Sequence, residues 1–231
     1  MRYRLVCFDV DGTLIDNIEY SWELFHNYFE TDKKRRIWAR DKYYKGEFSY
    51  LDWANHDIGM WIEKGATKGE FIKAMKTIKL MKGALETLKE LKKHNLKLAI
   101  ISGSLNIILE HFIPNYEDFF DDVFLSWLYF DKNNKLVRAE STEFDMIKKA
   151  EALRKIAKRE GFKLEECVHI GDHHNDVEIA KIAGLSIAFD AKDDELRKVA
   201  DVIIDKKDLR EVLLYIIPQG NLTHSLKLNK E

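Results

Sequence analysis

Three apolar runs of this 231-residue chain end in side chains that can carry chemistry. Residues 5–8 lead into Asp9, Asp11 and Gly12; residues 96–101 lead into Ser102 and Gly103; residues 168–170 lead into Asp172, Asn175 and Asp176. If these runs are parallel strands, their carboxyl ends lie at one edge of a sheet, where such sheets bind ligands. Carboxylates gathered there raise one another's pKa values unless a cation neutralises them, and oxygen ligands favour Mg²⁺. The sequence therefore predicts a Mg²⁺ site at that edge.

Asp9 and Asp11 are two residues apart and precede a glycine that allows a turn, so both carboxylates can enter one pocket. One of them can attack phosphorus to give an aspartyl-phosphate while the other transfers a proton. A carboxylate that approaches a phosphate dianion is repelled, so the metal and a cationic side chain must supply opposing charge. The spacing favours Lys149 for this task, with its neighbour Lys148 as the alternative. Ser102 and nearby backbone N–H groups can hold phosphate oxygens.

The elements that must position these residues alternate along the chain. Further apolar runs cover residues 186–189 and 202–204, and residues 84–91 and 150–156 have the spacing of helices with one buried face. This alternation predicts an α/β fold with a Rossmann-like parallel sheet covered on both sides. Residues 123–139 differ, because two extended runs flank a polar turn, which predicts a β-hairpin.

Residues 17–78 interrupt the alternation, because they contain no convincing core strand and have helical spacing. Four of the five tryptophans lie in this segment: Trp22, Trp38, Trp53 and Trp61. We interpret it as a small helical cap domain inserted after the first strand. The core catalytic domain then comprises residues 1–16 and 79–217, and residues 218–231 form a C-terminal tail.

The composition excludes several classes of partner. Lys and Arg number 38 and Asp and Glu 40, so the formal net charge is −2, which argues against nucleic acid or an anionic membrane as the main partner. No apolar run is long enough to span a bilayer, and residues 1–13 lack the apolar stretch of a signal peptide, so we expect a cytoplasmic protein. Cys7 and Cys167 lie inside apolar runs and are expected to be buried packing residues. The sequence gives no oligomeric state.

Four ordered motifs resemble those of the haloacid dehalogenase superfamily of phosphohydrolases, and among these the phosphoserine phosphatases. The motifs are Asp9-Val10-Asp11-Gly12-Thr13, then Ser102, then Lys149, then Gly171-Asp172 with Asn175-Asp176. The resemblance implies that Asp9 is the nucleophile. It also implies that Asp11 protonates the leaving alcohol and then activates the water that hydrolyses the aspartyl-phosphate.

The same resemblance implies how the metal and the phosphate are held. Mg²⁺ would be bound by Asp9, the backbone carbonyl of Asp11 and Asp172, while Asp176 would order a metal-bound water. The residues expected to bind the phosphoryl group or lie beside it are Gly12, Ser102, Gly103, Lys149 and Asn175.

The cap departs from the phosphoserine phosphatase pattern. Those enzymes hold the substrate's ammonium and carboxylate with a cap glutamate and a cap arginine. Here Ile18 takes the place of the glutamate, with Glu19 one residue later, and Asp57 falls near the place of the arginine. The resemblance therefore predicts hydrolysis of a phosphomonoester, whereas the cap residues do not match those that bind phosphoserine.

Two further cap and loop positions bear on specificity. Glu19 and Tyr44 are candidate substrate contacts because of their places in the cap. His173 and His174 are adjacent but have no nearby cysteine that could complete a transition-metal site, so we expect them at the pocket mouth or facing solvent.

Together these features predict a Mg²⁺-dependent phosphatase that hydrolyses a small phosphomonoester beneath a helical cap. Two alternatives use the same scaffold: a phosphotransferase or phosphomutase that passes the phosphoryl group to a sugar hydroxyl, and a non-catalytic phosphate-binding relative. A dehalogenase ranks last, because the acids Asp11, Asp172 and Asp176 serve little purpose in that chemistry.

Overall fold

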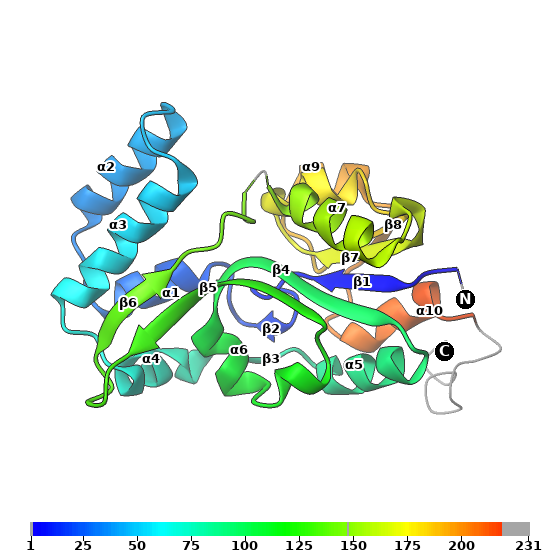
Figure 1. Cartoon of the computed structure of the whole chain (residues 1–231), viewed down its shortest axis with the longest axis horizontal. Helices are drawn as coiled ribbons and strands as arrows, with labels where there is room; N and C mark the ends of the chain where they lie inside the picture. Colours follow the sequence, from blue (N-terminus) through cyan, green and yellow to red (C-terminus); the bar gives the residue numbers. More distant parts are fainter. Residues whose placement is uncertain (1, 147, 219–231) are drawn as a thin grey trace.

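A seven-stranded sheet forms the centre of the computed structural model, which describes residues 2–146 and 148–218 (Figure 1). The strands lie in the order β6-β5-β4-β1-β7-β8-β9, and all neighbours are parallel except β5 and β6. Their bounds are β1 Leu5–Phe8, β4 Lys97–Leu105, β5 Asp122–Phe130, β6 Leu136–Glu140, β7 Cys167–Gly171, β8 Leu185–Phe189 and β9 Val202–Ile204. The predicted parallel α/β sheet is confirmed, as is the hairpin, which is β5–β6.

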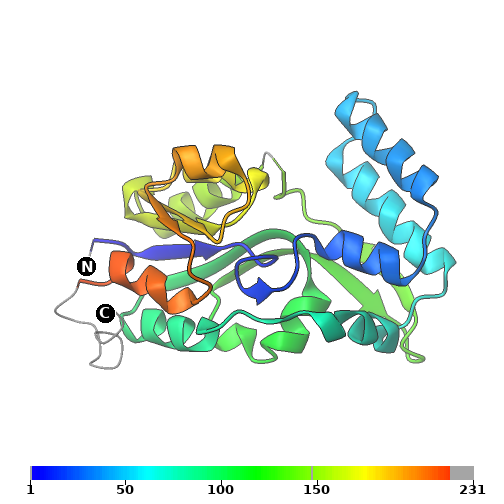
Figure 2. The same cartoon turned by 180° about the vertical axis from the view of Figure 1, so that it is seen from behind.

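Successive side chains of β1 point to opposite faces of the sheet, and all four are apolar, so both faces must be covered. Val6 and Phe8 belong to one apolar cluster, whereas Leu5 and Cys7 belong to another on the opposite face. Helices α5 (Ala84–Lys93), α6 (Asn106–Phe112) and α10 (Leu213–Ile216) lie on the first face, and α7 (Lys149–Glu160), α8 (Val177–Ala180) and α9 (Asp194–Val199) on the second (Figures 1 and 2). Cys7 and Cys167 are buried thiols, as expected.

The segment between the first two core strands is helical, as predicted. It contains α1 (Ser21–Tyr28), α2 (Lys33–Tyr44), α3 (Tyr50–Glu63) and α4 (Lys68–Ala74). Reciprocal capping hydrogen bonds between Ser49 and Asp52 start α3, and those between Thr67 and Glu70 start α4. The local sequence therefore sets where these helices begin.

A short two-stranded ribbon marks the place where the chain leaves and re-enters the core. Strand β2 (Ile15–Asp16) pairs antiparallel with β3 (Lys79–Leu80), on either side of the inserted helices. Beyond this ribbon, α2 and α3 project as a helical hairpin from one end of the molecule (Figures 1 and 2).

The inserted helices nevertheless share the apolar core of the sheet. Phe25 of α1 and Phe71 of α4 belong to the same buried cluster as Phe8 of β1. The rings of Phe71 and Phe130 of β5 also meet edge to face, with centroids 5.9 Å apart. Thus α1 and α4 are anchored to the core, and the hairpin of α2 and α3 is the part that extends beyond it.

The remaining sequence predictions are that the chain has no membrane-spanning segment and that residues 218–231 form a tail. Within residues 2–146 and 148–218, no helix is long and apolar enough to cross a bilayer. The predicted tail begins at Pro218, and residues 219–231 lie outside the described residues.

Candidate active site

The site lies where strand order reverses in the sheet. β1 is flanked by β4 on one side and β7 on the other, with Phe8 paired to both Ile100 and Ile170. The residues that follow these strands are therefore adjacent, and the backbone N–H of Asp9 donates to the carbonyl of Ile170 at 3.0 Å. The carboxyl ends of three strands form the crevice where open α/β sheets bind their ligands.

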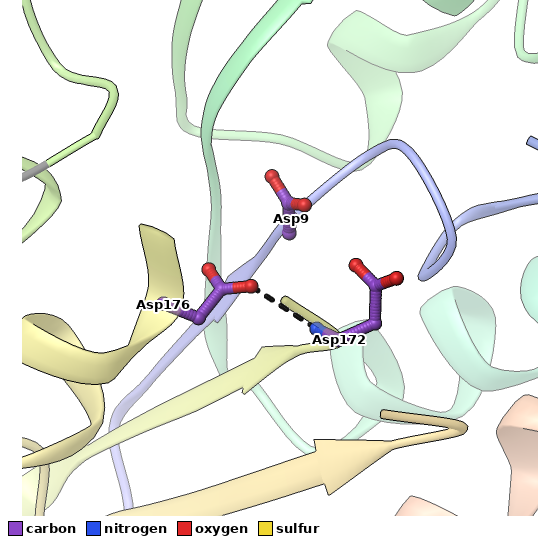
Figure 3. A group of neighbouring side chains, drawn as sticks. All are labelled: Asp9, Asp172 and Asp176. Carbon is purple, nitrogen blue, oxygen red and sulfur yellow. Dashed lines mark hydrogen bonds between the residues drawn. The ribbon is translucent and has the colours of Figure 1, made fainter. Parts of the chain in front are cut away.

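Three carboxylates meet in this crevice. Asp9, Asp172 and Asp176 are buried, and each offers an oxygen within 4.8 Å of the others (Figure 3). Burial raises the pKa of Asp9 to about 7, although the charge of Lys149 opposes the rise. Burial, followed by the charges of Asp9 and Asp176, also raises the pKa of Asp172 well above its usual value. Buried acids this close together favour a bound cation.

The free oxygen atoms of the cluster show where a cation fits. Asp172 Oδ2 is buried and has no hydrogen-bond partner among the described residues; Lys192 Nζ lies 3.5 Å away. Asp9 has one oxygen held by Lys149, which leaves Oδ2. The all-oxygen donor set and the orphaned oxygen of Asp172 together fit a divalent metal ion.

Lys149 is the cation of the site. Its Nζ lies 2.8 Å from Asp9 Oδ1 and 2.8 Å from Asp176 Oδ1, and its side chain is fully buried. Burial lowers the pKa of Lys149, but the charges of Asp176 and Asp9 outweigh it, so the net pKa is raised and the group stays an ammonium. The alternative, Lys148, instead pairs with Glu143 at 2.9 Å near the surface.

Asp176 uses both of its oxygens to hold its neighbours. Oδ2 accepts from the backbone N–H of Asp172 at 3.0 Å (Figure 3). It also accepts from the N–H of His173 at 3.2 Å, while Oδ1 contacts Lys149 and lies 3.0 Å from His169 Nε2. Burial raises the pKa of Asp176, but Lys149 and His169 more than offset it and keep the pKa below its usual value. Asp176 therefore fixes the backbone of the loop that carries Asp172 through these hydrogen bonds. His169 was not predicted as a site residue from the sequence, although it is the polar residue of an otherwise apolar strand.

Asp11 faces away from the three-acid cluster and toward the inserted helices. Its Oδ2 accepts from the backbone N–H of Ser21 at 2.7 Å, and its Oδ1 accepts from Ser104 Oγ at 2.8 Å. Burial raises the pKa of Asp11. Its carboxylate is thus not part of the three-acid cluster. The contacts of Ser21 and Ser104 with Asp11 were not predicted from the sequence.

Gly12 allows Asp172 to approach the turn after β1. Its φ of +74° lies in the left-handed region, and a Cβ built on it would be 2.1 Å from Asp172 Oδ2. A residue with a side chain would therefore displace the carboxylate that the metal site needs.

The phosphate-binding candidates lie at the end of β4 and beside it. The pairing of β4 with β1 ends at Ile100, and its pairing with β5 shifts in register between Ile101 and Leu105. Ser102 and Gly103 therefore lie outside the regular ladder. Their backbone N–H groups can then donate to a ligand. The Ser102 hydroxyl is also one of the groups that lower the pKa of Asp9.

Asn175 lies on the other side of the same crevice. Its Nδ2 donates to Asp145 Oδ1 at 2.8 Å, and its Oδ1 is buried without a hydrogen-bond partner among the described residues. Asp145 was not identified from the sequence, because it lies between the hairpin and α7, outside the motifs.

The two specificity candidates of the cap line different cavities. Glu19 borders a cavity of about 210 Å³ together with Gly12 and Lys192. Tyr44 borders a larger cavity of about 840 Å³ together with Asn175 and His174.

The histidines and Asp57 also have clear surroundings. His173 Nε2 lies 3.4 Å from Glu19, and a ring nitrogen lies 2.9 Å from the hydroxyl of Tyr20, so His173 links the core to the cap. His174 is exposed at the larger cavity. Asp57 is buried and pairs with His26 at 3.2 Å, so it serves the interior of the cap.

The fold and the site define an α/β enzyme in which carboxylates suited to a divalent metal lie beside a buried lysine at a switch point of the sheet. The sequence model of one family, described as haloacid dehalogenase-like hydrolase, matches residues 3–184, and the chain belongs to this family. Enzymes of this family typically use a divalent metal and pass through an aspartyl-phosphate.

Known proteins agree with this placement. The chain is 34% identical over 218 residues to a phosphoserine phosphatase of Methanocaldococcus jannaschii, covering 93% of this chain and 98% of that protein. Solved structures of a substrate-bound phosphoserine phosphatase and of a phospho-aspartyl intermediate analogue of phosphoserine phosphatase are each 31% identical, with TM-scores of 0.70 and 0.69. Both cover 94% of this chain, and 99% and 100% of their own. The protein is a phosphomonoester hydrolase that resembles phosphoserine phosphatases.

Proposed function

We propose that the protein is a Mg²⁺-dependent phosphatase in which Asp9 is the nucleophile and Asp11 the proton-transfer group. The observation that carries this proposal is the buried contact between Lys149 and Asp9, 2.8 Å long, beside the free oxygen of Asp172. This contact supports the proposal because it brings an ammonium, a carboxylate that could attack phosphorus and a carboxylate oxygen that could bind metal close together, as phosphoryl transfer needs. A relic site would have no reason to keep a charged lysine fully buried.

Asp9 and Asp172 would hold Mg²⁺, with the Asp11 carbonyl as the third predicted ligand. When bound, Mg²⁺ supplies positive charge against the oxygens of the phosphoryl group. Lys149 Nζ lies 2.8 Å from Asp9 Oδ1 and so holds the carboxylate that attacks phosphorus. Ser102, the Gly103 backbone and Lys149 bind the transferring phosphoryl oxygens.

The reaction then has two steps. One carboxylate oxygen of Asp9 forms a bond to phosphorus, the bond from phosphorus to the alcohol oxygen breaks, and Asp11 gives its proton to that oxygen. In the second step Asp11 takes a proton from water, which attacks the aspartyl-phosphate, releases phosphate and restores Asp9. Hydrogen bonds from Ser21 and Ser104 hold Asp11 in place for both transfers.

The larger cavity indicates the kind of alcohol that leaves. It reaches Asn175, and its walls carry the aromatic rings of Tyr43, Tyr44 and Phe48 from the cap and two carboxylates, Glu178 and Glu195, from the core. Among the described residues that line it, none is Lys or Arg. Aromatic faces and carboxylates favour an uncharged or ammonium-bearing group, whereas a substrate carboxylate would meet like charge. We therefore propose a small phosphomonoester whose alcohol carries no carboxylate.

The test is phosphate release from a panel that includes choline phosphate, ethanolamine phosphate, glycerol phosphate and phosphoserine. It is run with Mg²⁺, with EDTA and with Asp9→Asn. We expect release that needs Mg²⁺, is lost in Asp9→Asn and is at least about tenfold lower in kcat/KM for phosphoserine than for the esters without a carboxylate.

Each part of the proposal has its own contrary outcome. Release that survives Asp9→Asn contradicts the nucleophile, and a preference for phosphoserine contradicts the leaving-group argument. Transfer of the phosphoryl group to an added sugar in place of water favours the phosphotransferase alternative.

A further inference from the structure

The carboxylate of Asp145 lies inside the active site although the four motifs do not include this residue. Asp145 is 9% exposed and sits between β6 and α7. Its Oδ1 accepts from Asn175 Nδ2 at 2.8 Å, and its Oδ2 accepts from the hydroxyl of Tyr50 at 2.7 Å. The carboxylate therefore has one partner in the core and one in the cap.

The same carboxylate lies directly against Gly103. A Cβ built on Gly103 would be 1.9 Å from Asp145 Oδ2 and 2.2 Å from its Cγ, so only a glycine fits there. The proposed function assigns the Gly103 backbone to the phosphoryl oxygens, and the motif that contains Asn175 predicts that this residue binds the same group or lies beside it. A carboxylate and a phosphate monoester both present acceptor oxygens with negative charge, so they compete for the same donors.

The electrostatics agree with this location. Asp145 is among the charges that raise the pKa of Lys149, after Asp176 and Asp9, and it also contributes to the raised pKa of Asp11. Its charge thus acts on both the cation and the proton-transfer group of the site. A substrate phosphate that arrives while Asp145 is in place meets repulsion, and the Nδ2 donor of Asn175 is already occupied.

Tyr50 gives the contact a second consequence. It is the first residue of α3, in the helical hairpin that projects beyond the core. The hydroxyl of Tyr50 therefore ties that hairpin to Asp145 and, through Asp145, to Asn175. Displacement of the carboxylate from Gly103 would also break this tie.

We propose that Asp145 is an internal anion that occupies the phosphate subsite beside Gly103 and Asn175 and fastens the cap through Tyr50 until a phosphoryl group displaces it. This inference rests on the proposed function, because it assumes that Gly103 and Asn175 receive phosphate. In this proposal Asp145 sets the affinity of the site for phosphate. It also couples phosphate binding to the position of the cap. We call the form in which Asp145 contacts Asn175 and Tyr50 the latched form, and these contacts the latch. When this form dominates, the apparent affinity for phosphate is reduced by a factor equal to the fraction of the protein that is not latched.

The test measures binding of inorganic phosphate to the full-length protein with Mg²⁺ present, by calorimetry. Asp145→Asn removes the competing charge and keeps the volume of the side chain. Tyr50→Phe removes only the hydroxyl that holds Asp145 and leaves its charge in place. Glu143→Gln is the matched control, because Glu143 is a nearby acid whose carboxylate pairs at the surface with Lys148 and Lys155 at 2.9 and 3.8 Å.

We expect phosphate to bind at least about tenfold more tightly to Asp145→Asn and about threefold more tightly to Tyr50→Phe, with Glu143→Gln within twofold of the parent. Unchanged or weaker binding to Asp145→Asn overturns the proposal. Tighter binding to Asp145→Asn without any effect of Tyr50→Phe also overturns it, because simple charge repulsion would then explain the result. If Asp145→Asn does not fold, as judged by thermal unfolding, the result for Tyr50→Phe decides alone.

The phosphate-binding test and the ester-hydrolysis test of the proposed function can fail independently. Phosphate binding that responds to both variants, in a protein that releases phosphate from no ester, supports the latch and contradicts the phosphatase. Ester hydrolysis that depends on Asp9, with phosphate binding that ignores both variants, supports the phosphatase and contradicts the latch.

Discussion

The backbone N–H of Ser21, the first residue of α1, donates to the carboxylate of Asp11 at 2.7 Å. The inserted helices are therefore in direct contact with the side chain proposed to move the proton. A second contact reinforces the first, because Trp22 Nε1 donates to the carbonyl of Gly103 at 2.9 Å. The start of α1 thus helps to build the active site as well as to cover it.

The buried ammonium of Lys149 makes a strong prediction about stability and activity together. Lys149→Met leaves Asp9 and Asp176 without their shared cation, so we expect a loss of roughly 3–5 kcal/mol in the free energy of unfolding. Phosphate release should fall by roughly a hundredfold or more. Urea unfolding and the release assay measure both effects.

Lys148→Met is the control for that change, because its ammonium pairs with Glu143 near the surface. It should leave both measurements close to those of the parent. Equal losses in the two variants would contradict the assignment of Lys149.

Gly12→Ala tests the close approach of Asp172 to the turn. The new Cβ would lie 2.1 Å from Asp172 Oδ2, so the carboxylate must move. We expect the Mg²⁺ concentration for half-maximal activity to rise by roughly ten- to a hundredfold. Gly65→Ala is a matched control, because its φ of +67° is close to that of Gly12 and a Cβ there meets nothing within 4 Å. Both changes share the backbone strain, so only the difference between them reports on Asp172. Equal Mg²⁺ titrations for the two variants would refute the argument.

His169 is predicted to act through Asp176. His169→Leu removes the contact of 3.0 Å to Asp176 Oδ1 and loosens the loop that carries Asp172. We expect the Mg²⁺ concentration for half-maximal activity to rise about tenfold, with little change in KM at saturating Mg²⁺. His174→Leu, at an exposed histidine of the same loop, should leave the Mg²⁺ titration unchanged. A change in KM alone would indicate contact with substrate instead.

The buried acids predict an unusual pH dependence for the metal-free protein. The pKa of Asp9 rises on folding from 3.8 to about 7, so between these values the unfolded chain binds fewer protons than the folded one. The stability contributed by protonated Asp9 is complete below pH 4 and is lost as the pH rises through about 7. In EDTA we expect the free energy of unfolding to fall over this window by up to about 1.4 kcal/mol per pH unit, and Mg²⁺ to reverse the fall. Thermal unfolding from pH 4.5 to 8 measures it, and a flat profile in EDTA would contradict it.

The sheet and the four motifs could be predicted because each depends on local sequence. Apolar runs followed by acids mark strand ends, and the parallel order brings those ends together, which places Asp9 beside Asp172. The helical spacing of residues 150–156 likewise separates buried Lys149 from exposed Lys148.

The remaining contacts could not be predicted because they join segments that are distant in the chain. Ser104 and Asp11 are 93 residues apart, and Tyr50 and Asp145 are 95 apart. Nothing in the pattern around Asp145 shows that it turns toward Gly103. Asp57 fell near the place of a substrate-binding arginine, but its partners His26 and His56 make it part of the buried cap interior.

The apolar core that runs without a break from β1 into α1 and α4 limits how this protein can be altered or can diverge. Cutting the chain at the β2–β3 ribbon would separate Phe25 and Phe71 from the cluster that contains Phe8, so neither piece would keep a closed interior. We expect the whole chain to melt in one cooperative transition. The hairpin of α2 and α3 is the portion that could be exchanged between relatives, so new substrate preferences can arise there while the catalytic core stays intact.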